Sequence, residues 1–210
     1  LRYGEDFLER VGDRIWRLRV QDADLTLRAT SGPMAVEGTG LTGVKRPEDM
    51  HYYTFPRLEA RGALRGRAAR GLFWYDHQWG SSWVGPEMGW SWWGLQLEDG
   101  RNLNAYVLRD VKSGAIHRSV ATLDDKVLSL DATPLEYWIS TTKVRYPVSW
   151  RLKAGDLDLT VQPLFQDRET PVLGEQESIW EGPVRVSGSV AGRGFQELVS
   201  YARERRRPPK

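Results

Sequence analysis

Hydrophobic and polar residues alternate with a period of two along most of the chain, which is the pattern of strands that bury one face. Trp16, Leu18 and Val20 share one side of such a strand, and the alternation returns over 25–29 after a polar turn. This pair predicts a hairpin. Residues 3–10, in contrast, favour one or two turns of helix.

Further strands are predicted at short intervals after residue 50, separated by glycine-containing turns that are typical of hairpins. They comprise 51–65, 68–76, 87–98, 101–109, 116–123, 126–131, 135–143, 148–153, 156–163, 179–190 and 193–201. No helical period longer than about two turns follows residue 12. Many short antiparallel strands indicate an all-β fold, either a sandwich or a closed barrel.

The segment 31–50 is rich in loop signals, with four glycines and the turn sequence Arg46-Pro-Glu-Asp49. It therefore predicts a boundary, with a new unit from residue 46 to residue 202. The end of the chain, 203–210, is a basic tail that we interpret as a solvated end and not as a nucleic-acid arm.

Composition limits the chemistry and the surroundings of this 210-residue chain. It holds no cysteine, which excludes disulfides, thiol nucleophiles and zinc sites built on cysteine. No apolar run approaches the roughly 18 residues of a transmembrane segment. The first residues show neither an initiator methionine nor a signal pattern, so we expect that an upstream part was removed or left out; the compartment stays open.

Tryptophan is unusually frequent, and six of the ten tryptophans lie between residues 74 and 93. In a strand over 74–79, Tyr75, His77 and Trp79 share one face, and the even-numbered residues share the other. Aromatic residues on both faces must be covered on both, which favours an aromatic cavity for a ligand over a core filled by the tryptophans themselves.

Several catalytic and cofactor motifs are absent. The three histidines, at positions 51, 77 and 117, have no metal-ligand spacing, and there is no serine-hydrolase elbow or phosphate-binding glycine loop. We therefore expect no metal and no cofactor.

Four ordered blocks resemble the AttH and CrtC-like double-lipocalin family, which includes carotenoid 1,2-hydratases and lipocalin-fold Diels-Alderases. The blocks are Tyr52-Tyr53 with Pro56-Arg57-Leu58 and Gly62; 74–80; 89–100; and Trp180-Glu181-Gly182 with Glu197-Leu198 and Tyr201. The resemblance implies a lipocalin-like β-barrel over 46–202. It also implies that 1–45 is the carboxyl-terminal part of a first lipocalin-like domain, most of which is missing here.

Two positions depart from the family's pattern. Gln78 stands in place of a motif glutamate, and Ser91 in place of an aspartate. Both substitutions remove a potential acid, although Asp76 or Glu181 could still supply one if burial raised its pKa.

The function implied is the binding of a hydrophobic polyene, polyketide or terpenoid of secondary metabolism. Cyclisation of the Diels-Alderase kind ranks slightly first, because it survives the loss of acids. Alkene hydration and non-catalytic carriage remain alternatives, whereas a carbohydrate-binding sandwich fits less well. The predicted catalytic residues are His77, Asp76 and Tyr75, and the predicted substrate-binding residues are Trp79, Gln78, Trp90, Trp92, Tyr53, Tyr106 and Glu181.

Overall fold

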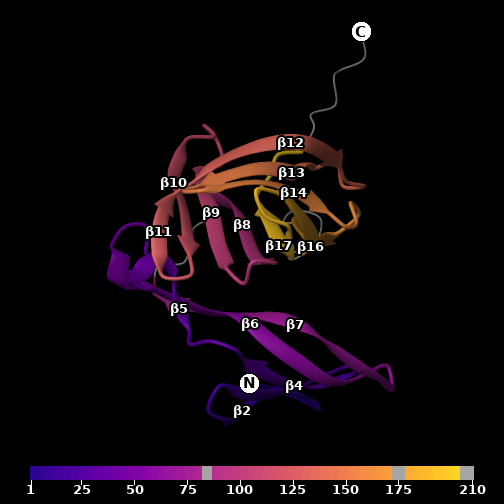
Figure 1. Ribbon diagram of the computed structural model, residues 1–210. Helices are drawn as coiled ribbons and strands as arrows, with labels where there is room; N and C mark the ends of the chain where they lie inside the picture. Colours follow the sequence, from indigo (N-terminus) through magenta and orange to yellow (C-terminus); the bar gives the residue numbers. More distant parts are fainter. Residues whose placement is uncertain (82–86, 172–177, 204–210) are drawn as a thin grey trace.

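The computed structural model describes residues 1–81, 87–171 and 178–203, which form two antiparallel sheets with very little helix. Figure 1 shows the sheets as two layers, with the amino-terminal strands below and the later strands above. The expected all-β class is confirmed. No helix in the described part of the chain is long and apolar enough to cross a membrane.

Sheet A is built from the first seven strands, in the order β1-β2-β3-β4-β6-β5 with β7 on the free side of β6. Its strands are β1 (Arg2–Tyr3), β2 (Asp6–Gly12), β3 (Ile15–Val20), β4 (Ala23–Ala29), β5 (Met34–Ala35), β6 (Met50–Leu64) and β7 (Arg67–Gly80). Two short 3-10 helices, η1 (Val36–Gly38) and η2 (Pro47–Asp49), lie between β5 and β6.

Sheet B curls into a half-barrel in the order β11-β10-β9-β8-β17-β16-β14-β13-β12, with β15 paired to β16. Its strands are β8 (Met88–Leu97), β9 (Asn102–Asp110), β10 (Ile116–Leu123), β11 (Lys126–Ser129), β12 (Asp131–Ile139), β13 (Arg145–Ala154), β14 (Leu157–Pro163), β15 (Glu169–Pro171), β16 (Ser178–Gly188) and β17 (Gly192–Val199).

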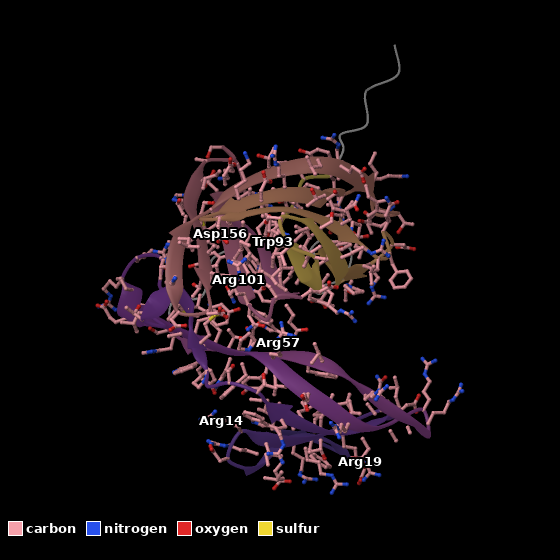
Figure 2. All side chains as sticks on the ribbon, viewed as in Figure 1. Arg14, Arg19, Arg57, Trp93, Arg101 and Asp156 are labelled. Carbon is pink, nitrogen blue, oxygen red and sulfur yellow. The ribbon has the colours of Figure 1, made fainter. Side chains whose placement is uncertain are left out.

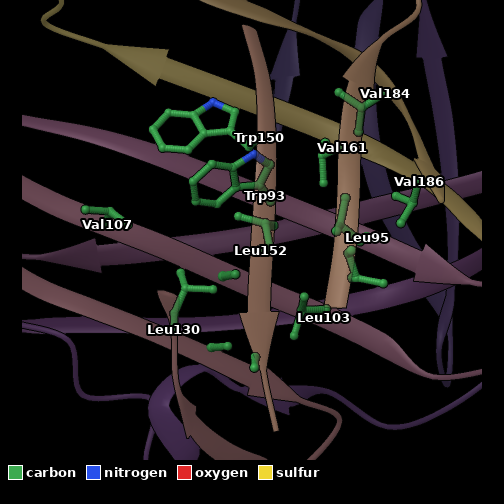
Figure 3. Packing of buried hydrophobic residues seen from close by; sticks show 14 of the residues in the cluster. Trp93, Leu95, Leu103, Val107, Leu130, Trp150, Leu152, Val161, Val184 and Val186 are labelled. Atoms are coloured by element: carbon green, nitrogen blue, oxygen red, sulfur yellow. The ribbon is translucent and has the colours of Figure 1, made fainter. Parts of the chain in front are cut away.

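The inside of sheet B is filled by its own side chains, as Figure 3 shows. Trp93 and Trp180 are fully buried, and the rings of Trp93 and Trp150 meet edge to face with centroids 5.1 Å apart. An aromatic cavity inside this barrel was one expectation from the sequence. Leucine, valine and three tryptophan side chains fill that space instead, because side chains from both walls interdigitate there.

The two sheets are joined by polar contacts between β6 and the β8–β9 hairpin. Gln96 Nε2 donates to the carbonyl oxygens of Pro56 at 2.8 Å and Phe73 at 3.0 Å. Arg57, which lies between the sheets in Figure 2, donates to Asn102 Oδ1 at 3.1 Å and to the Leu97 carbonyl at 3.0 Å. These bonds satisfy buried backbone groups on both sheets and fix how the sheets face each other.

The sequence predictions were wrong at three places. Residues 3–10 are not helical, because β2 pairs with β3 along its length and a short helix lacks such support. The strand expected over 135–143 is β12, which starts at Asp131; Pro134 is tolerated because β12 lies at the sheet edge. The 31–50 loop contains β5 and both 3-10 helices.

The predicted boundary near residue 46 does not coincide with the change between sheets. β6 pairs with β4 and β7 pairs with β6, so both belong to sheet A, and sheet B begins only at Met88. Of the predicted tail, Arg203 forms a β-bridge with Val144, and 204–210 lie outside the described residues.

Candidate functional site

A cleft runs between sheet A and the outer face of sheet B, and we call it the inter-sheet cleft. One part is a cavity of about 260 Å³. It is lined by Thr42, Val44, Met50, Tyr52, Asp76, Gln78, Trp90, Trp92, Tyr106, Leu108 and Glu197. A second cavity, of about 640 Å³, shares Asp76, Trp92 and Glu197 with the first. These three residues therefore mark the point where the two cavities meet.

Asp76 reaches the cleft from β7, where regular alternation places it on the same side as Trp74. The indole N–H of Trp74 donates to Oδ1 of Asp76 at 2.8 Å. Water reaches the carboxyl through the cavity, but protein surrounds most of it. This desolvation raises the pKa of Asp76 to about 6, against hydrogen bonds from Trp74, Tyr52 and Thr54 that favour the ionised form.

Glu197 faces Asp76 from β17 on the opposite wall. The indole N–H of Trp90 donates to Oε1 of Glu197 at 2.7 Å. Burial raises the pKa of Glu197, and the negative charges of Glu181 and Asp76 raise it further. The cleft thus holds two carboxyl groups that retain protons more readily than ordinary acids, each fixed by one tryptophan.

Aromatic rings form much of the surface around these carboxyls. Trp92 packs edge to face against Trp74, with ring centroids 6.0 Å apart. Tyr52 accepts a hydrogen bond from Asn104 Nδ2 at 3.1 Å, and desolvation holds the pKa of Tyr52 well above its usual value. Faces of this kind attract cations, so the cleft combines proton donors with a wall that can stabilise positive charge.

Gly94 makes the approach of the two sheets possible. A Cβ at this position would lie 2.6 Å from the ring of Trp92 and 2.9 Å from the ring of Trp74. Only hydrogen leaves room for the Trp74 ring, and that ring holds Asp76.

The other face of β6 and β7 carries a separate aromatic group. The His77 Nδ1 and Tyr53 Oη atoms are 3.1 Å apart and hydrogen-bonded, and the rings of His77 and Trp79 have centroids 4.8 Å apart. Tyr53, Tyr75 and His77 line a cavity of about 530 Å³ together with residues of β2 and β3. This face points away from the inter-sheet cleft.

The predicted site residues are therefore divided between two faces of one hairpin. Of the three predicted catalytic residues, Asp76 lines the inter-sheet cleft, whereas Tyr75 and His77 lie on the other face of the hairpin. Among the predicted binding residues, Gln78, Trp90, Trp92 and Tyr106 line the cleft. Tyr53 and Trp79 lie with His77, and Glu181 stands opposite Glu197 in the β16–β17 register.

The two neutral substitutions differ in their consequences. Gln78 lines the cleft, so an acid is replaced there by an amide. Ser91 is buried and bonds to Tyr201, with 2.6 Å between the two hydroxyl oxygens. It points to the inside of sheet B, so its change removes no acid from the cleft.

The predicted site residues left out Tyr52, Trp74 and Glu197, which surround Asp76 in the cleft. Trp74 and Asp76 share a face by alternation alone, so their pairing could have been found. The family-like blocks contain Tyr52 and Glu197, but alternation could not place Glu197 in the cleft, because it meets Trp92 through a strand pairing between segments more than a hundred residues apart.

A model of the AttH-like family matches residues 7–201. The chain belongs to the AttH-like family. Kievitone hydratase of Fusarium solani subsp. phaseoli is 22% identical over 198 residues, covering 84% of this chain and 56% of that protein. The AttH-like chain thus spans little more than half the length of this curated relative.

Two solved structures share the fold. A protein assigned as AttH from Nitrosomonas europaea is 27% identical, with a TM-score of 0.82, over 93% of this chain and 68% of that chain. Kievitone hydratase from Nectria haematococca gives a TM-score of 0.75 at 23% identity, over 97% of this chain and 70% of that chain. The expected lipocalin-like fold and family are confirmed.

Proposed function

We propose that the inter-sheet cleft catalyses the addition of water to a carbon–carbon double bond of a hydrophobic compound. The observation that carries this proposal is the pair of facing carboxyls, Asp76 and Glu197, each held by an indole N–H and both raised in pKa. An alkene is a weak base, so its hydration needs a carboxylic acid that stays protonated near neutral pH.

Asp76 is the proton donor in this proposal. Its protonated carboxyl transfers a proton to one alkene carbon, and the other carbon becomes a cation. The rings of Trp92 and Tyr52 line the same cavity and stabilise that cation through their π faces. Because the cavity is apolar over most of its surface, the positive charge depends on these rings more than on solvent.

Glu197 is the base that completes the addition. Its carboxylate takes a proton from a water molecule as the water oxygen bonds to the cation. The product is an alcohol, and the proton passes from Glu197 back to Asp76 through water in the cleft. Atoms balance as one water added for each double bond lost.

The likeness to kievitone hydratase supports this proposal, because that relative bears the name of a hydratase. The position of His77 and Tyr75 supports it as well. For a cyclisation, His77, Tyr75 or Gln78 was expected to donate the activating hydrogen bond; His77 and Tyr75 lie outside the cleft that holds the carboxyls, whereas Gln78 lines it. Cyclisation stays a prediction, with Gln78 as its one donor in the cleft.

The test is hydration of a panel of terpenoid and polyketide alkenes, including kievitone, in water labelled with heavy oxygen. We expect one labelled hydroxyl in the product, and Asp76→Asn should lower kcat by on the order of 10²–10⁴. Asn keeps the shape of the side chain and its bond from Trp74 but cannot donate the proton.

The matched control is His77→Asn on the other face of the same strand. It should leave kcat within about twofold of the parent protein, because the His77 side chain lies on the opposite face of β7 and does not line the cleft. If His77→Asn lost turnover and Asp76→Asn kept it, the chemistry would lie on the other face and the proposal would be rejected. The absence of a labelled product from every alkene would reject it as well.

A further inference from the structure

Charged residues face each other across the strands of both sheets, and most of these pairs join opposite signs. In the described registers, opposite charges pair at five places, such as Arg28 with Glu59 and Lys153 with Asp158. Like charges pair at three: Arg61 with Arg70, Arg185 with Arg193, and Glu181 with Glu197. Like charges directly opposite each other destabilise a sheet, so these three need a reason.

All three like-charge pairs lie on the sides of their strands that face the inter-sheet cleft. Arg193 itself lines the larger cavity, and Arg185 follows Pro183, which also lines it, on the same side of β16. Arg70 lies two residues before Leu72, another lining residue, and so on the same side of β7. The two arginine pairs thus stand on opposite sheets at the same end of the cleft.

Few acidic side chains of the described residues lie near these guanidinium groups to balance their positive charge. Within the described residues, Arg61 has one acidic neighbour, Glu59 at 3.8 Å, and both side chains are largely exposed. The ion pairs found in those residues do not include Arg70, Arg185 or Arg193. Arginine elsewhere in this chain pairs closely, as Arg151 does with Asp158 at 2.6 Å. The end of the cleft therefore presents unmatched positive charge.

The wall between the arginines and the carboxyls is apolar. The larger cavity is lined there by Leu72, Phe73, Leu164 and Phe195, and the last three side chains are each more than a third exposed. Along β17, Arg193 and Glu197 are four residues apart, which corresponds to about 13 Å of extended strand. Positive charge at the mouth and carboxyls at the reacting point are thus joined by a hydrophobic path.

We propose that the natural ligand of this cleft is an anionic amphiphile, with a carboxylate or phosphate head held by Arg70 and Arg193 and an apolar chain that leads to Asp76. This inference rests on the proposed function for the identity of the reacting end. Arginine forks bind carboxylates and phosphates through two parallel hydrogen bonds, and a bound head relieves the repulsion within each arginine pair. The head fixes the register of the chain: along the strands it lies about 13 Å from Glu197 if measured from Arg193, and about 20 Å from Asp76 if measured from Arg70.

The test compares dodecanoate with dodecanol by isothermal titration calorimetry, both below the concentrations at which they form micelles. The chain is the same in the two probes, so the difference in affinity measures the head. We expect dodecanoate to bind about tenfold more tightly, because its charged head forms stronger hydrogen bonds with arginine than a neutral hydroxyl does. Added salt should reduce that preference, because the arginines are exposed.

The double variant R70Q/R193Q should lose the preference and keep the parent affinity for dodecanol. The double variant K112Q/K126Q removes the same total charge from two exposed residues that do not line the cleft, and it should keep the preference. Dodecyl phosphate should behave as dodecanoate does, which separates a general anion site from one specific for carboxylates.

Equal affinities for the two probes, a preference that survives in R70Q/R193Q, or binding to micelles and vesicles alone would overturn the inference. The proposed hydration stands or falls separately, because Asp76→Asn is tested on neutral alkenes that do not need the arginines.

Discussion

At the scale of single residues, the chain places two carboxyls on the walls of one cleft and gives each an indole N–H as its anchor. Trp74 holds Asp76 at 2.8 Å, and Trp90 holds Glu197 at 2.7 Å. The indole bond helps to orient each carboxyl, and Asp76 also accepts hydrogen bonds from Tyr52 and Thr54. Desolvation outweighs these hydrogen bonds in both cases, so both groups retain protons at higher pH than ordinary acids.

The pKa of about 6 at Asp76 predicts how the rate depends on pH. Hydration needs the protonated carboxyl, so kcat should fall as the pH rises through about 6. The sign for stability is the same: the folded protein binds this proton more tightly than the unfolded chain, whose reference pKa is 3.8, so the free energy of unfolding falls as pH rises through that window.

Urea titrations of the parent protein and Asp76→Asn measure that second effect. The variant should gain stability relative to the parent at about pH 8 and show less gain at about pH 4. The same difference at both pH values would contradict a raised pKa at Asp76.

Trp90→Phe tests the anchor of Glu197. The substitution keeps an aromatic wall but removes the N–H that favours the ionised carboxylate, so the pKa of Glu197 should rise further. In the pH profile of kcat/KM, the rise that accompanies loss of the proton from Glu197 should therefore shift to higher pH. Trp79→Phe, on the other face of β7, is the control, and a profile that moves equally in both variants would count against the role given to Trp90.

At the scale of the elements, the cleft depends on β7 and β8 lying close enough for their tryptophans to interlock. β7 alternates regularly and sends Trp74 and Asp76 to the cleft, while β8 sends Trp90 and Trp92 to the cleft and Trp93 into the core of sheet B. Two strands with aromatic residues on both sides therefore serve a packed interior and an open cleft at once. At Gly94, the rings of Trp74 and Trp92 occupy the space that a Cβ would need.

Gly94→Ala should displace the Trp74 ring, because a Cβ would lie within 3 Å of both Trp74 and Trp92. Overpacking of this kind costs about 1–3 kcal/mol of stability. Asp76 should also lose the hydrogen bond from Trp74, which orients its carboxyl and affects its pKa. We therefore expect kcat to fall by about tenfold or more. Thermal unfolding and turnover measure the two effects. Gly114→Ala, in a turn where no atom lies within 4 Å of the added Cβ, controls for the change at glycine although its backbone is left-handed there.

At the scale of the whole molecule, the two carboxyls face each other only because the two sheets keep one relative position. Asp76 belongs to sheet A and Glu197 to sheet B, and the bonds of Gln96 and Arg57 connect the sheets beside them. At the far end of the cleft, Arg118 of sheet B holds Glu37 of η1 at 2.9 Å.

Gln96→Ala should loosen this arrangement. It leaves the carbonyls of Pro56 and Phe73 without their buried donor, which should cost about 1–3 kcal/mol of unfolding free energy. Hydrogen exchange should increase in β6 and β7 more than in β13 and β14. An increase spread evenly over both sheets would show that Gln96 stabilises the fold without positioning one sheet on the other.

The sequence by itself determined most of the strands and the division of 74–79 into two faces, because alternation is a local property that the backbone enforces. Its ordered motifs indicated the family. It also put Asp76, Gln78, Trp90 and Trp92 among the site residues. Local pattern could not determine which face of the hairpin meets the second sheet, or that Glu197 stands across from Asp76. Those facts depend on pairings between distant segments, and on side chains that fill the interior of sheet B and leave the cavity between the two sheets.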